Sequence, residues 1–213
     1  PPRSTLFPYT TLFRSPMEWF PQVGYLKNFI TKENILIWDY TYYDDLDWVE
    51  HFENKNILYH FPFIWDKLII WKFCAIATWV KFIMNWANHK MSWFSTYPFW
   101  IFWKWWEKAI PKMSDLPYKW DTIIWNDVWI WYESKIMPWV KIWNGSIIWA
   151  FCVVTKDVPA YTIVWWNPAK IIRKRFDDET IEKLENIAWW NWDAEKITKN
   201  LEYIVWNDLE KLI

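Results

Sequence analysis

The sequence predicts a mainly β protein built as a parallel β-helix, and one spacing that occurs in two separate blocks carries that prediction. In the longer block an aliphatic residue recurs at every sixth position, at Ile124, Ile130, Ile136, Ile142, Ile148 and Val154. In the shorter block the same spacing links Ile64, Ile70, Ile76 and Phe82. Helices repeat apolar residues at three and four positions and half-buried strands at two, whereas a six-residue period indicates short flat sides around a common interior. We therefore expect these residues to share one core, on coils of about eighteen residues.

Tryptophan often follows the aliphatic residue, at positions 65, 71, 125, 131, 143 and 149. The chain has 25 Trp and only 2 Gly in 213 residues, although glycine normally makes up about 7% of residues. Turns between coils favour glycine, which enters left-handed backbone conformations freely, so about twenty of the tryptophans stand at glycine-like positions. We interpret them as a decoding artefact, in which UGA codons that mean glycine were read as tryptophan. The alternative is a chain that is truly rich in tryptophan.

This interpretation makes a prediction about backbone geometry. Ten of the tryptophans lie in or beside expected turns, at positions 65, 71, 79, 125, 131, 139, 143, 149, 165 and 166. We expect about half of them to need a left-handed conformation, at a cost of roughly 1–2 kcal/mol each. The chain as written would then fold poorly.

The N-terminal part precedes the two hexapeptide blocks. Residues 1–16 include a stretch, 6–15, that a common sequencing adapter encodes, and we exclude it from the fold. Residues 17–63 form an N-terminal segment, with short strands expected at 25–29 and 35–37 and an aromatic, acidic loop at 39–45. That loop reads equally well as part of a pocket and as an exposed turn.

The β-helix itself is expected over residues 64–176, interrupted by a long inserted loop at 84–117 that is rich in polar and aromatic residues. Such an excursion from a regular solenoid is often a binding or active-site loop. Two C-terminal helices are expected within 177–213, the first beginning after Asp177 and the second spanning roughly 194–204. Their apolar stripes favour a role in covering the end of the coil or in packing on a neighbouring subunit.

Composition narrows the function classes. The formal net charge is −1 and basic residues are dispersed apart from Arg173 to Arg175, so we expect no nucleic-acid partner. No run of eighteen uncharged apolar residues occurs, so we expect no membrane span. Cys74 and Cys152 favour free, packed thiols in a cytoplasmic protein.

The candidate catalytic residue is His89. The chain has only three histidines, His51, His60 and His89, and no cluster with metal-ligand spacing, so we expect no metal. A lone histidine is usually structural or solvated. His89 differs because it lies just inside the loop that interrupts the repeat, where an imidazole can act as a general base.

Several segments resemble the xenobiotic O-acetyltransferases, which include the hexapeptide-type chloramphenicol acetyltransferases and the streptogramin A acetyltransferases. They are Asn-Trp-Ala-Asn-His at 85–89, Ser-Thr-Tyr-Pro-Phe at 95–99, Asn-Asp-Val-Trp-Ile at 126–130 and Trp-Trp-Asn-Trp at 189–192, together with the two hexapeptide blocks. The resemblance covers residues from about 35 to 192 and departs from the family chiefly at the glycine-like tryptophans.

The resemblance implies a left-handed parallel β-helix that forms a homotrimer, with acetyl-CoA and a hydroxyl acceptor meeting between subunits. His89 corresponds to the catalytic base, and Tyr42 and Phe61 correspond to acceptor-binding positions. Phe61 departs from the Tyr that family members can carry there. The coenzyme A channel corresponds to Trp131, Trp149, Thr155 and Lys156, where glycine at 131 and 149 would give the pantetheine arm room.

The implied activity is acetyl-CoA-dependent transfer of an acetyl group to a hydroxyl of a small xenobiotic such as chloramphenicol or streptogramin A, an antibiotic-resistance reaction. Two alternatives remain open. One is an O-acetyltransferase for sugars or other small hydroxyl compounds on the same fold. The other is a non-catalytic hexapeptide-repeat scaffold protein, which binding of acetyl-CoA would exclude, since fold alone does not settle function.

Overall fold

The structure, a computed structural model, describes residues 16–212 apart from residues 18, 47, 103 and 117–119. The adapter-like residues 1–15 therefore lie outside the described part of the chain. Within the described residues the strands form three sheets. The first sheet contains β1 (Val23–Tyr25), β3 (Tyr42–Asp44), β6 (Ala75–Ile76), β9 (Trp129–Ile130), β12 (Ile147–Ile148), β14 (Thr162–Trp165) and β15 (Lys170–Lys174).

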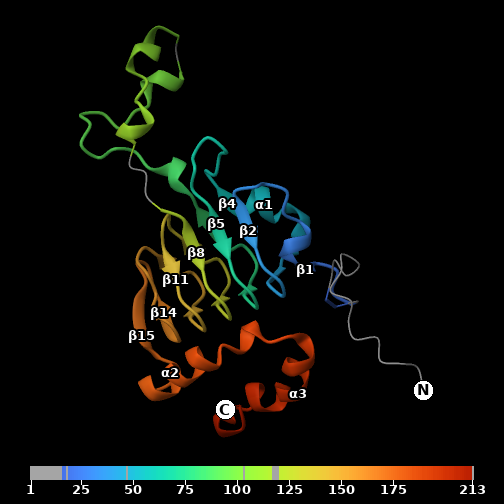
Figure 1. Cartoon of the computed structure of the whole chain (residues 1–213). Helices are drawn as coiled ribbons and strands as arrows, with labels where there is room; N and C mark the ends of the chain where they lie inside the picture. The colour runs from blue at the N-terminus through green and yellow to red at the C-terminus, as the bar shows by residue number, and fades with distance from the viewer. Residues whose placement is uncertain (1–15, 18, 47, 103, 117–119, 213) are drawn as a thin grey trace.

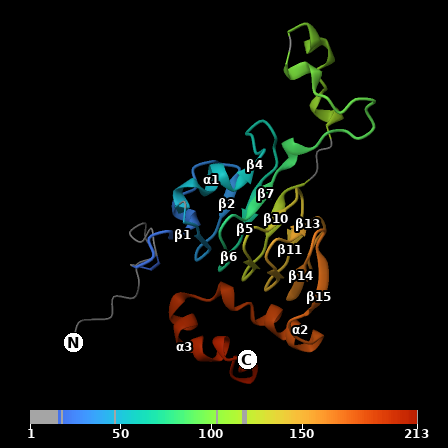
Figure 2. The same cartoon turned by 180° about the vertical axis from the view of Figure 1, so that it is seen from behind.

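The other two sheets have four strands each. The second sheet contains β4 (Ile57–Leu58), β7 (Lys81–Ile83), β10 (Lys135–Ile136) and β13 (Val153–Val154), which Figure 2 shows in order. The third sheet contains β2 (Ile35–Ile37), β5 (Leu68–Ile70), β8 (Thr122–Ile124) and β11 (Lys141–Ile142), side by side in Figure 1.

The chain visits the third, first and second sheets in turn, so each circuit is one coil of a three-sided parallel β-helix. From β8 to β13 the parallel partners are eighteen residues apart in each sheet: Ile123 pairs with Lys141, Trp129 with Ile147, and Lys135 with Val153. This register confirms the predicted coil length. It also places each aliphatic residue over its counterpart in the next coil. The last coil is shorter, since Ile147 pairs with Ile163.

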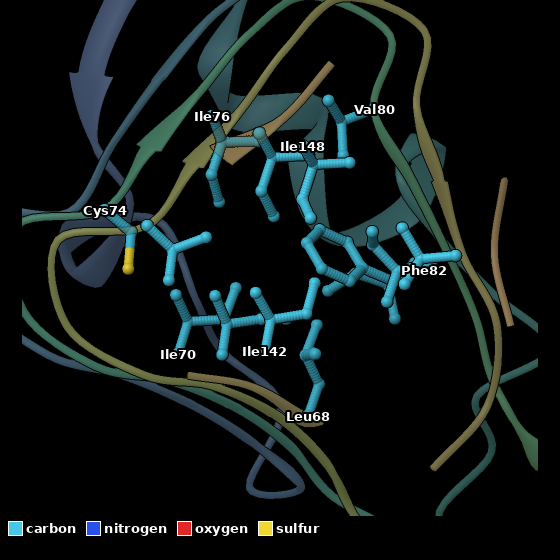
Figure 3. Packing of buried hydrophobic residues seen from close by; sticks show 14 of the residues in the cluster. Leu68, Ile70, Cys74, Ile76, Val80, Phe82, Ile142 and Ile148 are labelled. Atoms are coloured by element: carbon cyan, nitrogen blue, oxygen red, sulfur yellow. The ribbon is translucent and has the colours of Figure 1, made fainter. Parts of the chain in front are cut away.

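The six-residue spacing correctly identified the core. The side chains of Ile70, Ile76, Ile124, Ile130, Ile136, Ile142 and Ile148 are all fully buried in one cluster. Figure 3 shows side chains from all three sides of the coil pointing toward one centre, among them Ile70, Ile76, Phe82 and Ile142. Every element between Ile124 and Val154 is a strand or a turn, as predicted.

The β-helix begins earlier than the six-residue spacing indicates. Strands β2, β3 and β4 pair in parallel with β5, β6 and β7, so a first coil lies within residues 17–63. This coil is irregular because η2 (Val49–His51) and α1 (Phe52–Lys55) are inserted in it. Two expectations are wrong here. The expected loop at 39–45 contains β3, and the expected strand at 25–29 is the 3-10 turn η1 (Leu26–Asn28) after β1.

Residues 84–121, which we call the excursion, connect β7 to β8. Their described part contains the 3-10 turns η3 (Asn85–Ala87), η4 (Phe99–Ile101), η5 (Lys104–Ala109) and η6 (Met113–Asp115). In both overall views the excursion (green) projects away from the coil, on the side opposite the C-terminal helices (Figures 1 and 2). Among the described residues no helix is long and apolar enough to cross a membrane.

The two expected C-terminal helices are present as α2 (Asp178–Ile187) and α3 (Ala194–Val205), with the 3-10 turns η7 (Trp189–Asn191) and η8 (Leu209–Lys211) after them. Each helix begins at an aspartate whose carboxylate accepts a backbone N–H from the first turn. Asp177 accepts from Thr180, and Asp193 accepts from Lys196. Such caps satisfy donors that have no partner inside the helix.

The turns only partly follow the glycine hypothesis. Of the ten turn tryptophans, only Trp79, Trp139 and Trp166 have positive φ, fewer than the expected half. The turn after the third sheet places its left-handed residue at Tyr40, Phe73, Asp127, Gly145 and Tyr161, so one of five is glycine. The other tryptophans therefore need an explanation other than left-handed backbone.

Four tryptophans stack along one corner of the coil, and we call them the tryptophan ladder. Trp38, Trp71, Trp125 and Trp143 each follow a strand of the third sheet. Their ring centroids are 4.4, 5.3 and 5.3 Å apart along the series, with interplanar angles of 14°, 2° and 6°. The repeat thus brings identical side chains into contact, as it does inside the core.

The two cysteines are free and buried, as expected. Burial raises the pKa of the Cys74 thiol to about 12 and that of the Cys152 thiol to about 11. Both thiols are therefore protonated and poor nucleophiles at neutral pH.

Candidate active site

His89 lies where the coil gives way to the excursion. Met84, fully buried, is the last core residue after β7, and the 3-10 turn η3 then carries the chain outward to an exposed His89. His89 Nδ1 is 2.9 Å from the Thr96 carbonyl oxygen. A carbonyl can only accept, so this contact assigns the proton to Nδ1 and leaves the lone pair on Nε2. The imidazole is thus held in the tautomer that a general base needs.

A cavity of about 480 Å³ opens beside His89. Its size falls in the range typical of small-molecule sites. Asn85, Asn88 and His89 supply polar groups, and the rest of the lining is apolar or aromatic. The further lining residues are Ile64, Trp86, Trp93, Pro98, Trp100, Ile101, Ile110, Pro111 and Leu116. Most come from the excursion, so the cavity suits a compact, largely apolar molecule with a polar group at one end.

The two predicted acceptor-binding residues differ in their relation to this cavity. Phe61 packs edge-on against Trp86, with ring centroids 5.9 Å apart, and Trp86 lines the cavity. Tyr42 is on β3 in the first sheet and is not part of the lining. Burial, and then the charge of Asp44, raise the pKa of the Tyr42 phenol. Within one chain the structure brings Phe61 to the edge of the site and leaves Tyr42 apart from it.

The four predicted coenzyme A positions flank the second sheet. Trp131 and Trp149 follow β9 and β12 at the corner before that sheet, and their rings meet edge-to-face at 4.8 Å. Thr155 and Lys156 follow β13 at the corner after it and are exposed. The excursion that carries His89 leaves the coil at this second corner, because it follows β7, which lies two strands from β13 in the same sheet. At about 4.8 Å per strand, the ends of β7 and β13 are roughly 10 Å apart along the coil.

Sequence reasoning missed a buried polar group behind the cavity. Asp66 is fully buried, and its carboxylate accepts two hydrogen bonds from Asn85, which lines the cavity. The two residues are 19 apart in the sequence, close to one coil, and both lie between the second and third sheets, Asp66 before β5 and Asn85 after β7. The coil length could therefore have brought them together, but neither residue stands at an aliphatic position of the repeat. Among the described residues no three His, Cys, Asp or Glu side chains gather as metal ligands would.

The chain matches no family model. It is 49% identical to a virginiamycin A acetyltransferase of Staphylococcus aureus over 197 residues, 92% of this chain and 89% of that protein. The chain belongs to the xenobiotic acetyltransferase family.

Two further relatives of this xenobiotic acetyltransferase have related names. A probable macrolide acetyltransferase of Lysinibacillus sphaericus is 56% identical over 149 residues, 70% of this chain and 83% of that protein. A chloramphenicol acetyltransferase of Escherichia coli is 43% identical over 141 residues, 65% of this chain and 66% of that protein. Among solved structures, a hexapeptide-repeat acetyltransferase of Vibrio cholerae in complex with acetyl coenzyme A matches with a TM-score of 0.42 and 22% identity, covering 68% of this chain and 62% of that chain.

Proposed function

We propose that this xenobiotic acetyltransferase transfers the acetyl group of acetyl-CoA to a hydroxyl group of a small, largely apolar xenobiotic, with His89 as the general base. The observation that carries the proposal is the contact between His89 Nδ1 and the Thr96 carbonyl, which leaves Nε2 as a proton acceptor beside an apolar cavity. The relatives named for virginiamycin A, macrolides and chloramphenicol support antibiotics as the substrate class.

The proposed reaction is a single acyl transfer. Nε2 of His89 accepts the proton of the acceptor hydroxyl while its oxygen attacks the thioester carbonyl carbon, and backbone N–H groups stabilise the oxyanion that forms. The C–S bond then breaks, and the leaving thiolate of coenzyme A accepts the proton from the imidazolium. The products are an O-acetyl ester and free coenzyme A, and His89 returns to its starting state.

The proposal assigns coenzyme A to the corners of the second sheet. Lys156 offers an exposed ammonium group that suits phosphate groups, and Thr155 offers a hydroxyl beside it. The Trp131 and Trp149 rings occupy the wall where the pantetheine arm would pass. Glycine at both positions would remove these rings and make room for the arm. The decoding hypothesis is therefore consistent with the proposed coenzyme A site.

The proposal also includes a left-handed coil and a homotrimer in the cytoplasm. The excursion exposes large apolar side chains, among them Met91, Phe94, Phe102 and Trp105, each more than half exposed. A single chain leaves these groups in water, whereas a neighbouring copy would cover them. Tyr42, Thr155 and Lys156 of such a copy could then complete the site. The buried, free thiols fit a reducing compartment.

The test is an acceptor panel. The chain as written and its Trp131→Gly/Trp149→Gly variant are incubated with acetyl-CoA and chloramphenicol, virginiamycin A, a macrolide or maltose, and the released coenzyme A thiol is measured. We expect at least one antibiotic to be acetylated with kcat/KM well above that of maltose, and the glycine variant to be faster. Preferential acetylation of maltose would favour the sugar alternative. Absence of acetyl-CoA binding in calorimetry, in both proteins, would favour a scaffold.

A further inference from the structure

Asp66 anchors the start of the excursion from inside the coil. Its Oδ2 accepts the backbone N–H of Asn85 at 3.0 Å and the side-chain Nδ2 of Asn85 at 2.9 Å. The backbone carbonyl of Asp66 is 3.0 Å from Nε2 of His60, which is 6% exposed. A buried carboxylate is costly unless hydrogen bonds compensate its lost hydration. Here both bonds to the carboxylate come from one residue, so Asp66 fixes Asn85 in position and orientation.

The hydrogen bonds continue from Asn85 to the catalytic histidine. The Asn85 carbonyl accepts the backbone N–H of Asn88 at 3.1 Å and the side-chain Nδ2 of Asn88 at 3.2 Å. Asn88 immediately precedes His89, whose imidazole contacts the Thr96 carbonyl on the far side of the turn. Asp66, Asn85, Asn88, His89 and Thr96 thus form one continuous series that leads from the buried coil to the cavity.

Three buried polar atoms beside this series make no hydrogen bond that could hold the turn in another way. Within the described part of the chain, Asp66 Oδ1, His60 Nδ1 and Asn85 Oδ1 are buried without a hydrogen-bond partner. His60 Nε2 lies 3.7 Å from Asp66 Oδ1, too far for a direct hydrogen bond. Among the described residues, the hydrogen bonds of the carboxylate are therefore those from Asn85, and they fix the position of the turn η3 rather than bracing the wall of the coil.

We propose that Asp66 is a positioning residue for acetyl transfer, which holds Asn85 and, through Asn88, keeps His89 Nε2 at its place in the cavity. The inference rests on the proposed function. Misplacing a catalytic group by about 1 Å can cost roughly 10²-fold in rate. Loss of Asp66 should therefore lower kcat, while the KM for acetyl-CoA stays nearly constant because Asp66 lies away from the positions assigned to coenzyme A.

Glu53 provides a matched control. Like Asp66 it is a buried carboxylate, 6% exposed, that accepts bonds from a neighbouring segment: the backbone N–H groups of Thr31 and Lys32 at 3.1 and 2.6 Å, and the Thr31 hydroxyl at 2.8 Å. It does not line the His89 cavity. A purely structural role for Asp66 would make Glu53→Ala and Asp66→Ala behave alike.

The experiment compares kcat, both KM values and the melting temperature of Asp66→Ala, Asp66→Asn and Glu53→Ala. We expect Asp66→Ala to lower kcat about 10- to 100-fold, with the KM for acetyl-CoA within about twofold. Both bonds from Asn85 reach the same oxygen, so the amide oxygen in Asp66→Asn can keep them, and this variant should recover most of kcat. Glu53→Ala should lower the melting temperature and retain kcat per folded protein.

Equal kcat in Asp66→Ala and wild type would overturn the inference, as would equal losses of kcat in Asp66→Ala and Glu53→Ala. If Asp66→Ala does not fold, the kcat of Asn85→Asp tests the inference. This variant places two carboxylates that repel each other side by side, without opening a cavity. An unchanged kcat in that variant would also refute the idea. A wild-type protein without acetyl transfer would instead refute the proposed function. Amide hydrogen exchange separates the two failures, since faster exchange confined to residues 85–89 in Asp66→Ala reports positioning without any turnover.

Discussion

The coils from β8 to β13 and the excursion between β7 and β8 belong to one chain but are stabilised differently. In the coils the inward isoleucines are fully buried, and backbone groups of successive coils bond to each other, as Trp125 N–H does to Ile142 O at 2.8 Å. In the excursion the described elements are short 3-10 turns, and Phe94 and Ile110 are exposed. The coils supply stability, and the excursion supplies the cavity. The candidate active site lies where the two regions meet.

The largest expected effect is catalytic and falls at that junction. His89→Ala should lower acetyl transfer by roughly 10²–10⁴-fold, the usual contribution of a positioned acid–base group. The loss should appear in kcat, with acetyl-CoA affinity from calorimetry nearly unchanged, because the proposed role of the imidazole is to accept the proton of the acceptor hydroxyl. His51, exposed in η2 of the first coil, is the control. An equal loss in His51→Ala would show that the general base has been misassigned.

The second effect contrasts the stability of the two regions. Ile136→Ala removes a fully buried side chain and should lower the unfolding free energy by about 2–5 kcal/mol. Phe94→Ala alters a fully exposed side chain and should change that free energy by less than about 0.5 kcal/mol. If the proposed homotrimer forms, this variant should instead weaken it, as measured by sedimentation velocity. A stable trimer in Phe94→Ala together with a large loss of stability would mean that Phe94 packs within its own chain.

The third effect separates two kinds of tryptophan in the coil. Trp79 and Trp166 have φ of 63° and 86°, so glycine there should relieve backbone strain and raise the unfolding free energy by about 1 kcal/mol each. Trp125 stacks between Trp71 and Trp143 without a positive φ, and Trp125→Gly should lower stability. Thermal melts of the three variants test the contrast. A stability gain at all three positions would favour the glycine interpretation throughout.

The smallest expected effect is a pH dependence of the unfolding free energy that arises from Asp127, at a corner of the coil. Burial raises the pKa of Asp127 to about 6, although Arg175, at 3.7 Å, opposes the rise. An unfolded aspartate titrates near 3.9, so between about pH 4 and 6 the folded state binds more protons and loses stability as pH rises. Asp127→Asn should remove this loss. Because a third of the side chain is exposed, the variant should gain only about 0.5 kcal/mol relative to wild type from pH 4 to 7 in urea titrations.

The regular coils could be predicted from the sequence, whereas the irregular parts of the chain could not. The six-residue spacing identified the core because each inward side chain meets a copy of its own environment one coil away. Asp177 marked the start of α2 because a cap acts within four residues. The first coil was not predicted, because the turns inserted in it change the number of residues between paired strands. Ile57, for example, pairs with Phe82. The pairing of Asp66 with Asn85 was not predicted either, although the two residues are 19 apart, close to one coil, because neither stands at an aliphatic position that the spacing identifies.

The tryptophan ladder has a consequence for spectroscopy. Four indole rings in near-parallel stacks at 4.4–5.3 Å are close enough for their excited states to couple, so excitation spreads along the corner of the coil. The coupled rings come from coils that are far apart in sequence, from Trp38 to Trp143. Their circular dichroism band therefore reports the stacking of coils directly, and it would weaken each time one coil separates from the next, even where local strand structure persists.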